Sequence, residues 1–209
     1  NRYCLVAMSF AAALSFGCNP EKTPDNGGTG TTEPSGEYTV TGKVTDYELR
    51  PLEGVVVSDG LKSVRTGADG VYHIASDLSR VKFISVSTPS GYKPQLNGGV
   101  PLFYKKLSEC PKVGGTYTAD FSLKKISSDA DKYTLLISAD PQPRSRTRGG
   151  DKLAYHSLDC CADLYRDMEE YASSIPGQEV YGICLGDIVH EDMSLYAQYL
   201  EGMKSMGFP

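Results

Sequence analysis

The sequence predicts a β-sandwich followed by the first part of an α/β domain. Short β-branched runs separated by turn residues fill positions 37–125, as in sandwiches of antiparallel sheets. From position 131 onward, continuous apolar runs alternate with helical patterns, which is typical of buried parallel strands and their connecting helices. We therefore expect two folded units, at 37–125 and 131–209.

Composition bounds the function of the chain. Of its 209 residues 40% are hydrophobic, which is enough for a packed core, and the net charge is -5. Proteins that bind nucleic acids normally carry a basic face. We therefore expect no nucleic-acid binding.

The first 18 residues are predicted to be a lipoprotein signal peptide. Positions 4–16 are almost entirely apolar or small and follow Arg2; this run is shorter than the roughly 20 residues that span a bilayer and has the length of a signal-peptide core. The next residues complete the sequence LSFGC, which resembles a bacterial lipobox and implies a lipid on Cys18. We expect attachment to a membrane through Cys18 and a location in the cell envelope, in the outer membrane or facing the periplasm. The alternative is a buried helix that ends in Gly-Cys.

Positions 19–36 are predicted to be a flexible linker. They read NPEKTPDNGGTGTTEPSG and contain almost no apolar side chains. Such a segment cannot bury enough surface to offset the entropy lost on ordering.

The expected strands of the first unit lie at 38–44, 55–58, 63–66, 71–74, 81–86, 102–104 and 117–123. Asp59-Gly60 between the second and third runs predicts a tight hairpin. The segments 41–44 (TGKV), 51–55 (PLEGV) and 66–72 (TGADGVY) resemble the carboxypeptidase-regulatory-like, Ig-type modules of bacterial surface proteins. This resemblance implies an Ig-like sandwich and carries no catalytic residues.

The second unit is predicted to have the order strand–helix–strand–helix. Positions 133–138 and 180–185 are the buried strands, and apolar residues at helical spacing mark the two helices. These are Leu158, Cys161, Tyr165, Met168 and Ala172 for the first helix, and Tyr196, Tyr199, Leu200 and Met203 for the second. The connection predicts a parallel pair of strands with a right-handed crossover.

Acidic residues follow both predicted parallel strands. Asp140 comes just after the first strand and Asp187 just after the second. The carboxyl ends of neighbouring parallel strands form one edge of the sheet, where ligands bind in α/β folds. Carboxylates brought together repel unless a cation lies between them, and hard divalent cations prefer oxygen ligands. The alternative is a pair of ordinary turns or helix caps.

The segments 138–142 (SADPQ) and 185–189 (LGDIV) resemble the first two motifs of calcineurin-like metallophosphoesterases, in the exported Bacteroidetes-type arrangement with an N-terminal Ig-like domain. The resemblance implies two divalent metal ions (Mn, Fe, Zn or Mg), with Asp187 bridging them and Asp140 as a further ligand. Gln142 stands where the family usually has His, so it is the expected third ligand. His190 is assigned a catalytic role as a substrate contact or as support for a ligand; otherwise it is a plain helix-start residue. The basic loop with Arg144, Arg146 and Arg148 either attracts phosphate or is simply solvated.

The later motifs of that family, Gly-Asn-His and Gly-His-x-His, do not occur in this sequence. We therefore expect 131–209 to be the first part of the phosphoesterase domain and to be inactive by itself. The expected activity of the full-length protein is hydrolysis of a phosphorylated small molecule or a phosphodiester by a metal-activated water. The alternative is a non-catalytic surface-binding lipoprotein with a degenerate phosphoesterase domain.

Overall fold

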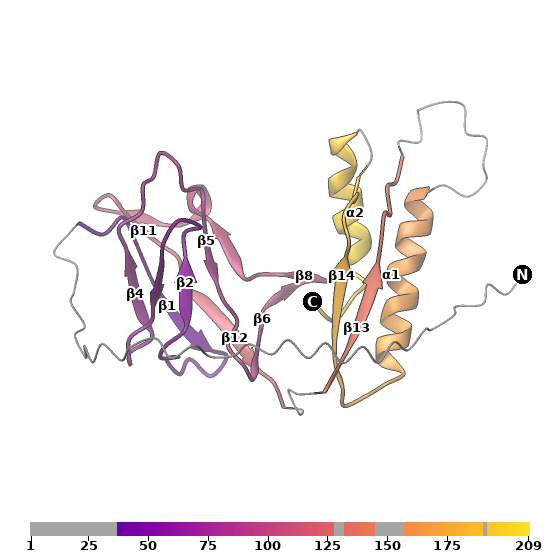
Figure 1. The fold of residues 1–209 in the computed structure, drawn as a ribbon, viewed down its shortest axis with the longest axis horizontal. Coiled ribbons are helices and arrows are strands. Elements are labelled where there is room, and N and C mark those ends of the chain that lie inside the picture. The colour runs from indigo at the N-terminus through magenta and orange to yellow at the C-terminus, as the bar shows by residue number, and fades with distance from the viewer. Residues whose placement is uncertain (1–36, 128–131, 145–156, 190–191) are drawn as a thin grey trace, which may run out of the picture. The chain divides into compact units, whose positions relative to one another are not determined.

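The structure is a computed structural model that describes residues 37–127, 132–144, 157–189 and 192–209 (Figure 1). The chain divides into two units, Asn1–Ser35 and Gly36–Pro209. The first unit lies outside the described residues, and so do the predicted signal peptide and linker.

One sheet of the β-rich part is built around β1, which runs through its middle. β1 pairs with β4 in the antiparallel sense and with β11 and β12 in the parallel sense, and β10 and β6 extend the sheet beyond them. The strands are β1 (Val40–Asp46), β4 (Val71–Ile74), β6 (Tyr92–Pro94), β10 (Lys112–Val113), β11 (Thr116–Thr118) and β12 (Phe121–Lys125).

A second sheet has the order β3-β2-β5-β9, and all its pairs are antiparallel. Its strands are β2 (Val56–Ser58), β3 (Ser63–Arg65), β5 (Phe83–Val86) and β9 (Tyr104–Lys106). A small separate hairpin joins β7 (Leu96–Asn97) and β8 (Val100–Pro101), and a 3-10 turn, η1 (Leu107–Glu109), follows β9. The predicted Asp59-Gly60 hairpin is the β2–β3 turn, with Ser58 opposite Ser63.

Alternating side chains of both sheets form one apolar core. On β1, Val40 and Val44 are buried whereas Lys43 between them is exposed, because successive strand residues point to opposite faces. Val57 and Ile84 of the second sheet are fully buried in the same cluster. The expectation of a β-rich N-terminal part is thereby confirmed.

The run predicted as one strand at 117–123 is divided into β11 and β12 at Ala119 and Asp120. The carbonyl of Ala119 accepts a hydrogen bond of 2.5 Å from the buried hydroxyl of Tyr72. The Asp120 carboxylate accepts the backbone N–H of Lys43 at 2.8 Å. These two contacts replace regular ladder bonds, so the strand is interrupted where its sequence looks continuous.

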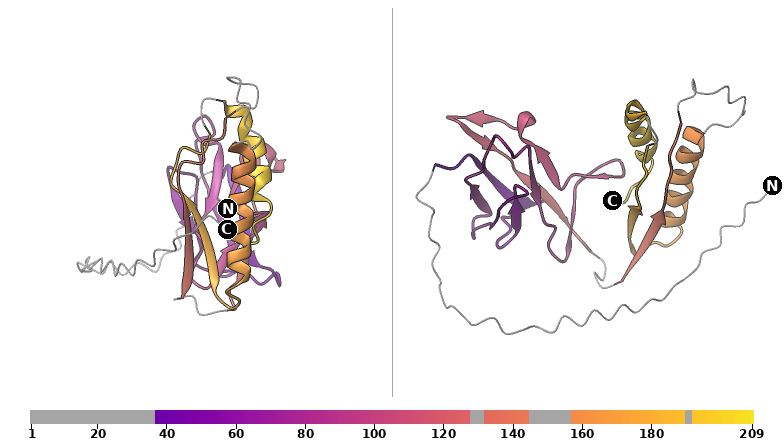
Figure 2. Two further views of the ribbon diagram at one scale, coloured as in Figure 1. Left: turned by 90° about the vertical axis from the view of Figure 1, so that its right-hand side faces the viewer. Right: turned by 45° about the horizontal axis from the view of Figure 1, so that its top comes forward.

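The C-terminal part has the element order β13 (Tyr133–Ser138), α1 (Ser157–Ser173), β14 (Glu179–Cys184), η2 (Met193–Leu195) and α2 (Tyr196–Met203). β13 and β14 are parallel and in register over their whole length, from Tyr133 opposite Glu179 to Ser138 opposite Cys184. Figures 1 and 2 show both helices on the same face of this pair. Gly177 at φ 85° turns the chain after α1, a conformation that costs glycine little.

The helices and strands share a second core. Cys161 and Tyr165 of α1, Tyr199 of α2 and Val180 of β14 are buried together, and Met168 and Ala172 pack against them. The helical spacing read from the sequence therefore identified the buried face of α1. On the other face of the strand pair, apolar side chains stay in solvent, among them Leu135, Ile137 (60% exposed), Ile183 and Leu185 (63% exposed).

No helix within the described residues is long and apolar enough to cross a bilayer.

Candidate site at the carboxyl ends of β13 and β14

The parallel register brings the two predicted acidic residues to the same edge. Ser138 and Cys184 are the last paired residues of β13 and β14, and the backbone N–H of Leu185 donates to the carbonyl of Ser138 at 2.9 Å. Asp140 and Asp187 follow within three residues of these strand ends, and both are exposed. The edge is therefore acidic and open to solvent.

The backbone at this edge is held in an unusual conformation. Asp140 (φ 47°), Gln142 (φ 30°) and Asp187 (φ 41°) lie in the left-handed region, and Leu49 is the other such non-glycine residue in the described parts of the chain. The left-handed region disfavours residues with a Cβ by about 1–2 kcal/mol. Strained backbone of this kind clusters at functional sites, where the surrounding structure maintains it.

Gln142 joins the two loops directly. Its side-chain Nε2 donates to Oδ2 of Asp187 at 2.5 Å, and its backbone N–H donates to the carbonyl of Asp187 at 3.1 Å. Two bonds between residues 45 positions apart fix the loop after β13 onto the loop after β14. The residue that the sequence singles out as a departure from the family pattern is thus the contact between the strand ends.

Two thiols lie against the backbone of the same loops. Sγ of Cys161, on α1, lies 3.8 Å from the carbonyl oxygen of Pro141, and Sγ of Cys184 lies 3.6 Å from that of Gly186. Burial raises the pKa of Cys161, and the neighbouring Cys160 and Cys184 raise it further. Cys161 therefore stays a neutral thiol that can donate weakly to the loop carbonyl.

A pair of tyrosines lies deeper in the same core. The rings of Tyr165 and Tyr199 meet edge to face with centroids 5.6 Å apart. Burial raises the pKa of Tyr165, and burial raises the pKa of Tyr199 to about 12. The buried Tyr165 hydroxyl has no hydrogen-bond partner among the described residues.

One anchoring residue has no counterpart in the sequence-based expectations. The hydroxyl of Ser157, the first residue of α1, accepts the backbone N–H of Arg144 at 2.9 Å. The bond ties the loop after β13 to the start of α1. A serine at the start of a helical pattern is the signal that could have identified it.

Three of the residues singled out in the sequence, His190, Arg146 and Arg148, lie outside the described residues. Within the described ranges, no group of three or more His, Cys, Asp or Glu side chains could hold a metal ion. Asp140 and Asp187 nevertheless lie on loops joined by Gln142. Together these three residues offer two carboxylates and one amide carbonyl, which are ligands that Mg²⁺ and Mn²⁺ prefer.

Comparisons with known proteins bear on the β-rich part. A search of curated proteins gives no match. A crystal structure of a mutant of the shaft pilin SpaA from Lactobacillus rhamnosus GG is 13% identical and covers 49% of this chain, with a TM-score of 0.29; this similarity is too low to support any inference. The chain spans about half (52%) of that structure's length. Residues 38–126 match the family model described as the N terminal of calcineurin-like phosphoesterase, and this match supports a calcineurin-like phosphoesterase family for the chain.

Proposed function

We propose that the full-length protein is a metal-dependent phosphoesterase whose first metal ligands are Asp140, Gln142 and Asp187. The family match of residues 38–126 supports hydrolase activity in the full-length protein. One observation carries the proposal: these three residues, whose side chains all contain oxygen and whose backbones all lie in the left-handed region, follow the carboxyl ends of two paired parallel strands. Divalent cations bound there would neutralise charge on phosphoryl oxygens and lower the pKa of water.

The residues of the chain have separate roles in this proposal. Asp187 would bridge two cations and Asp140 would hold one of them. Gln142 already contacts Asp187, so its amide would orient that carboxylate and present its carbonyl oxygen as a ligand. His190 is proposed to contact the substrate, a phosphorylated small molecule or a phosphodiester.

The proposal extends to location and architecture. We propose that Cys18 carries a lipid and holds the protein in the cell envelope, with 19–36 as the tether and the two β-sheets as an Ig-like sandwich. The apolar run at 4–16 and the sequence LSFGC support this. Metabolic labelling with a radioactive fatty acid tests it: the label should enter the wild-type protein and be lost in Cys18→Ser. Equal labelling of both proteins would contradict lipidation of Cys18.

A non-catalytic binding lipoprotein is the second candidate, and one observation favours it. The Gln142 amide donates to Asp187 at 2.5 Å, so this carboxylate already has a partner without a cation. In that case the edge is a structural turn, and no metal is needed to hold it.

Manganese binding to the chain separates the two candidates. Mn²⁺ broadens the amide NMR signals of nearby residues, even when it binds weakly. The phosphoesterase proposal expects broadening around 139–142 and 185–188 that disappears in Asp187→Asn. Asp167→Asn, an exposed carboxylate on α1, is the matched control and should leave the broadening unchanged.

The full-length protein with Mn²⁺ should also be tested for hydrolysis of p-nitrophenyl phosphate and of bis(p-nitrophenyl) phosphate. If neither compound is hydrolysed and no selective broadening is seen, the binding lipoprotein is favoured.

A further inference from the structure

Positive charge is concentrated in one segment of an otherwise acidic chain. The chain has a net charge of -5, yet positions 79–126 hold eight basic residues and only two acidic ones, a net charge of +6. The basic residues are Arg80, Lys82, Lys93, Lys105, Lys106, Lys112, Lys124 and Lys125, and the acidic ones are Glu109 and Asp120. A surface built from this segment attracts anions.

The same segment supplies most of the lining of a hollow in the β-rich part. The hollow has a volume of about 790 Å³ and is lined by side chains from β1, β5, β9, η1, β11, β12 and the loops between them. This size is within the range of sites that hold small organic ligands. Lys43 of β1 and Lys105 and Lys106 of β9 all line it; we call this hollow the lysine trough.

The three lysines of the trough are not equally engaged. Lys106 Nζ lies 3.4 Å from Oε1 of Glu109, in an exposed ion pair. Lys105 Nζ lies 5.9 Å from the ring centroid of Phe121. Within the described part of the chain, neither Lys43 nor Lys105 forms an ion pair with a carboxylate. Two ammonium groups are therefore available to an incoming anion.

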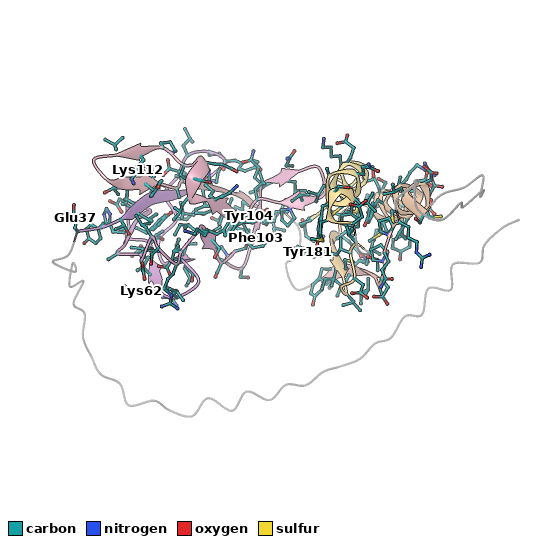
Figure 3. The ribbon with its side chains drawn as sticks, turned by 90° about the horizontal axis from the view of Figure 1, so that it is seen from above. Glu37, Lys62, Phe103, Tyr104, Lys112 and Tyr181 are labelled. Carbon is teal, nitrogen blue, oxygen red and sulfur yellow. The ribbon has the colours of Figure 1, made fainter. Side chains whose placement is uncertain are left out.

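Exposed aromatic rings lie at the trough. Phe83 (47% exposed) and Tyr104 (42% exposed) are in its lining, and their rings meet at 70° with centroids 5.9 Å apart. The ring of Phe103 packs against that of Tyr104 with an interplanar angle of 69° and centroids 5.5 Å apart, and Figure 3 shows these two residues side by side. Aromatic faces carry negative partial charge and attract polarised C–H groups such as those on the flat face of a sugar ring.

The trough also contains hydrogen-bond acceptors. The carboxylates of Glu109 and Asp120 belong to the lining. Carboxylates accept hydrogen bonds from hydroxyl groups and repel phosphates or other carboxylates. A ligand that fits this surface therefore combines an apolar ring face, hydroxyl donors and a limited number of negative charges.

We propose that the lysine trough binds an acidic oligosaccharide, with its carboxylate or phosphate groups paired to Lys43 and Lys105 and a sugar ring packed on Tyr104. A single-stranded nucleic acid fits less well, because its bases need successive stacking platforms, whereas Tyr104 meets both Phe83 and Phe103 edge to face. This inference is independent of the proposed phosphoesterase activity, since every lining residue lies between positions 43 and 122.

Titration of the whole chain with trigalacturonic acid, followed by NMR and calorimetry, tests the proposal. We expect saturable binding that shifts signals of β1, β9 and β12 and weakens at high salt, because screening reduces attraction between exposed charges. Replacing both lysines (Lys43→Gln with Lys105→Gln) should weaken binding about tenfold or more, as loss of charged hydrogen bonds does. Tyr104→Ser, at an exposed ring, should weaken it severalfold.

Lys62→Gln is the matched control. Lys62 is an exposed lysine outside the trough, and Figure 3 shows it well away from Tyr104. Its substitution should leave affinity within about twofold, because it removes a charge that does not face the ligand. Thermal unfolding by circular dichroism shows that each variant is folded.

Three other probes define what would overturn the proposal. Neutral galactotriose of the same length should bind at least about tenfold more weakly, because it lacks the charges that pair with lysine. Equal affinity for the neutral sugar, an equal loss in Lys62→Gln, or no binding of trigalacturonic acid would each contradict the proposed site. Tighter binding of oligo-dT or of vesicles containing anionic lipid would replace the sugar by a nucleic acid or a membrane surface.

Discussion

The side-chain amide of Gln142 donates to the carboxylate of Asp187 across the ends of two parallel strands, with Nε2 and Oδ2 2.5 Å apart. The two residues are 45 positions apart in the sequence, and the pairing of β13 with β14 brings them together. The contact constrains both loops that carry the candidate metal ligands.

Replacing Gln142 by His should strengthen binding of a transition metal. An imidazole nitrogen binds Zn²⁺ and Fe²⁺ better than an amide oxygen does. We expect Gln142→His to bind Zn²⁺ at least about tenfold more tightly than the wild type, whereas Gln142→Leu should bind more weakly than either. Isothermal titration with Zn²⁺ measures this, and unchanged affinity in Gln142→His would show that position 142 does not reach the ion.

Relieving the left-handed backbone at Asp140 should stabilise the fold while removing a ligand. Glycine adopts φ near 47° without a Cβ penalty, so Asp140→Gly should raise the free energy of unfolding by about 0.5–1 kcal/mol. The same variant should lose Mn²⁺ broadening. Urea unfolding followed by circular dichroism gives the stability.

The control for that substitution lies in the last turn of α1. Glu170 is exposed and helical, so Glu170→Gly should lower the free energy of unfolding by about 0.5 kcal/mol. A loss of stability in Asp140→Gly as well would show that the turn is not strained.

Acid should destabilise the β-rich part through Asp46. Burial works to raise the pKa of this carboxyl, but hydrogen bonds from the Arg50 side chain and backbone, the Arg50 charge and the Glu48 N–H outweigh it and lower the pKa. A carboxyl whose pKa is lower in the folded state stabilises the fold above its unfolded pKa of about 3.9, and this contribution is lost as pH falls through the folded value. Asp59, which accepts from Ser76 at 2.7 Å, has a lowered pKa and acts in the same direction.

Denaturation between about pH 2 and pH 7 tests this dependence. The wild type should lose stability below about pH 4. Arg50→Gln should be less stable than the wild type at neutral pH, and its free energy of unfolding should fall less steeply as the pH drops below about 4. An equally steep fall in Arg50→Gln would show that Arg50 does not set the protonation of Asp46. The chain has no Trp, so far-UV circular dichroism is the appropriate probe.

The interruption between β11 and β12 should depend on the Tyr72 hydroxyl. This buried group donates to the Ala119 carbonyl, so Tyr72→Phe leaves a buried acceptor unpaired and should cost about 1–3 kcal/mol. Tyr117→Phe, whose ring lies under Lys112 at 4.6 Å, is the control and should change stability by less than about 0.5 kcal/mol. Equal losses of stability in the two variants would show that the hydrogen bond from Tyr72 to Ala119 does not stabilise the fold.

Gly42 tests the same junction by steric means. A Cβ at this position would lie 2.1 Å from the Ala119 carbonyl oxygen and 2.7 Å from the Tyr72 hydroxyl. Gly42→Ala should therefore be strongly destabilising, by about 2–4 kcal/mol. Gly54→Ala has no atom within 4 Å of the added Cβ but sits at φ 73°, so it should cost only the left-handed penalty of about 1–2 kcal/mol. Urea unfolding of both variants measures the difference, and a smaller loss in Gly42→Ala than in Gly54→Ala would contradict the steric argument.

Local patterns were sufficient for much of the fold. The alternation around Val40 and Val44 reflects which face of β1 is buried, and the spacing of Cys161 and Tyr165 reflects the face of α1 that packs on the core. These features repeat with the period of the element, so they can be read from neighbouring residues alone. The break at Ala119 could not be read, because its cause is the distant Tyr72 hydroxyl.

The residues of the candidate site could be identified from the sequence, because Asp140, Gln142 and Asp187 each come just after an apolar run that predicts a strand. Three features emerge only from the folded chain: Gln142 contacts Asp187, all three residues are left-handed, and the Cys161 thiol lies against the loop carrying two of them. Strand register sets which loops meet, and register depends on pairing and packing over long separations in the chain rather than on local preference.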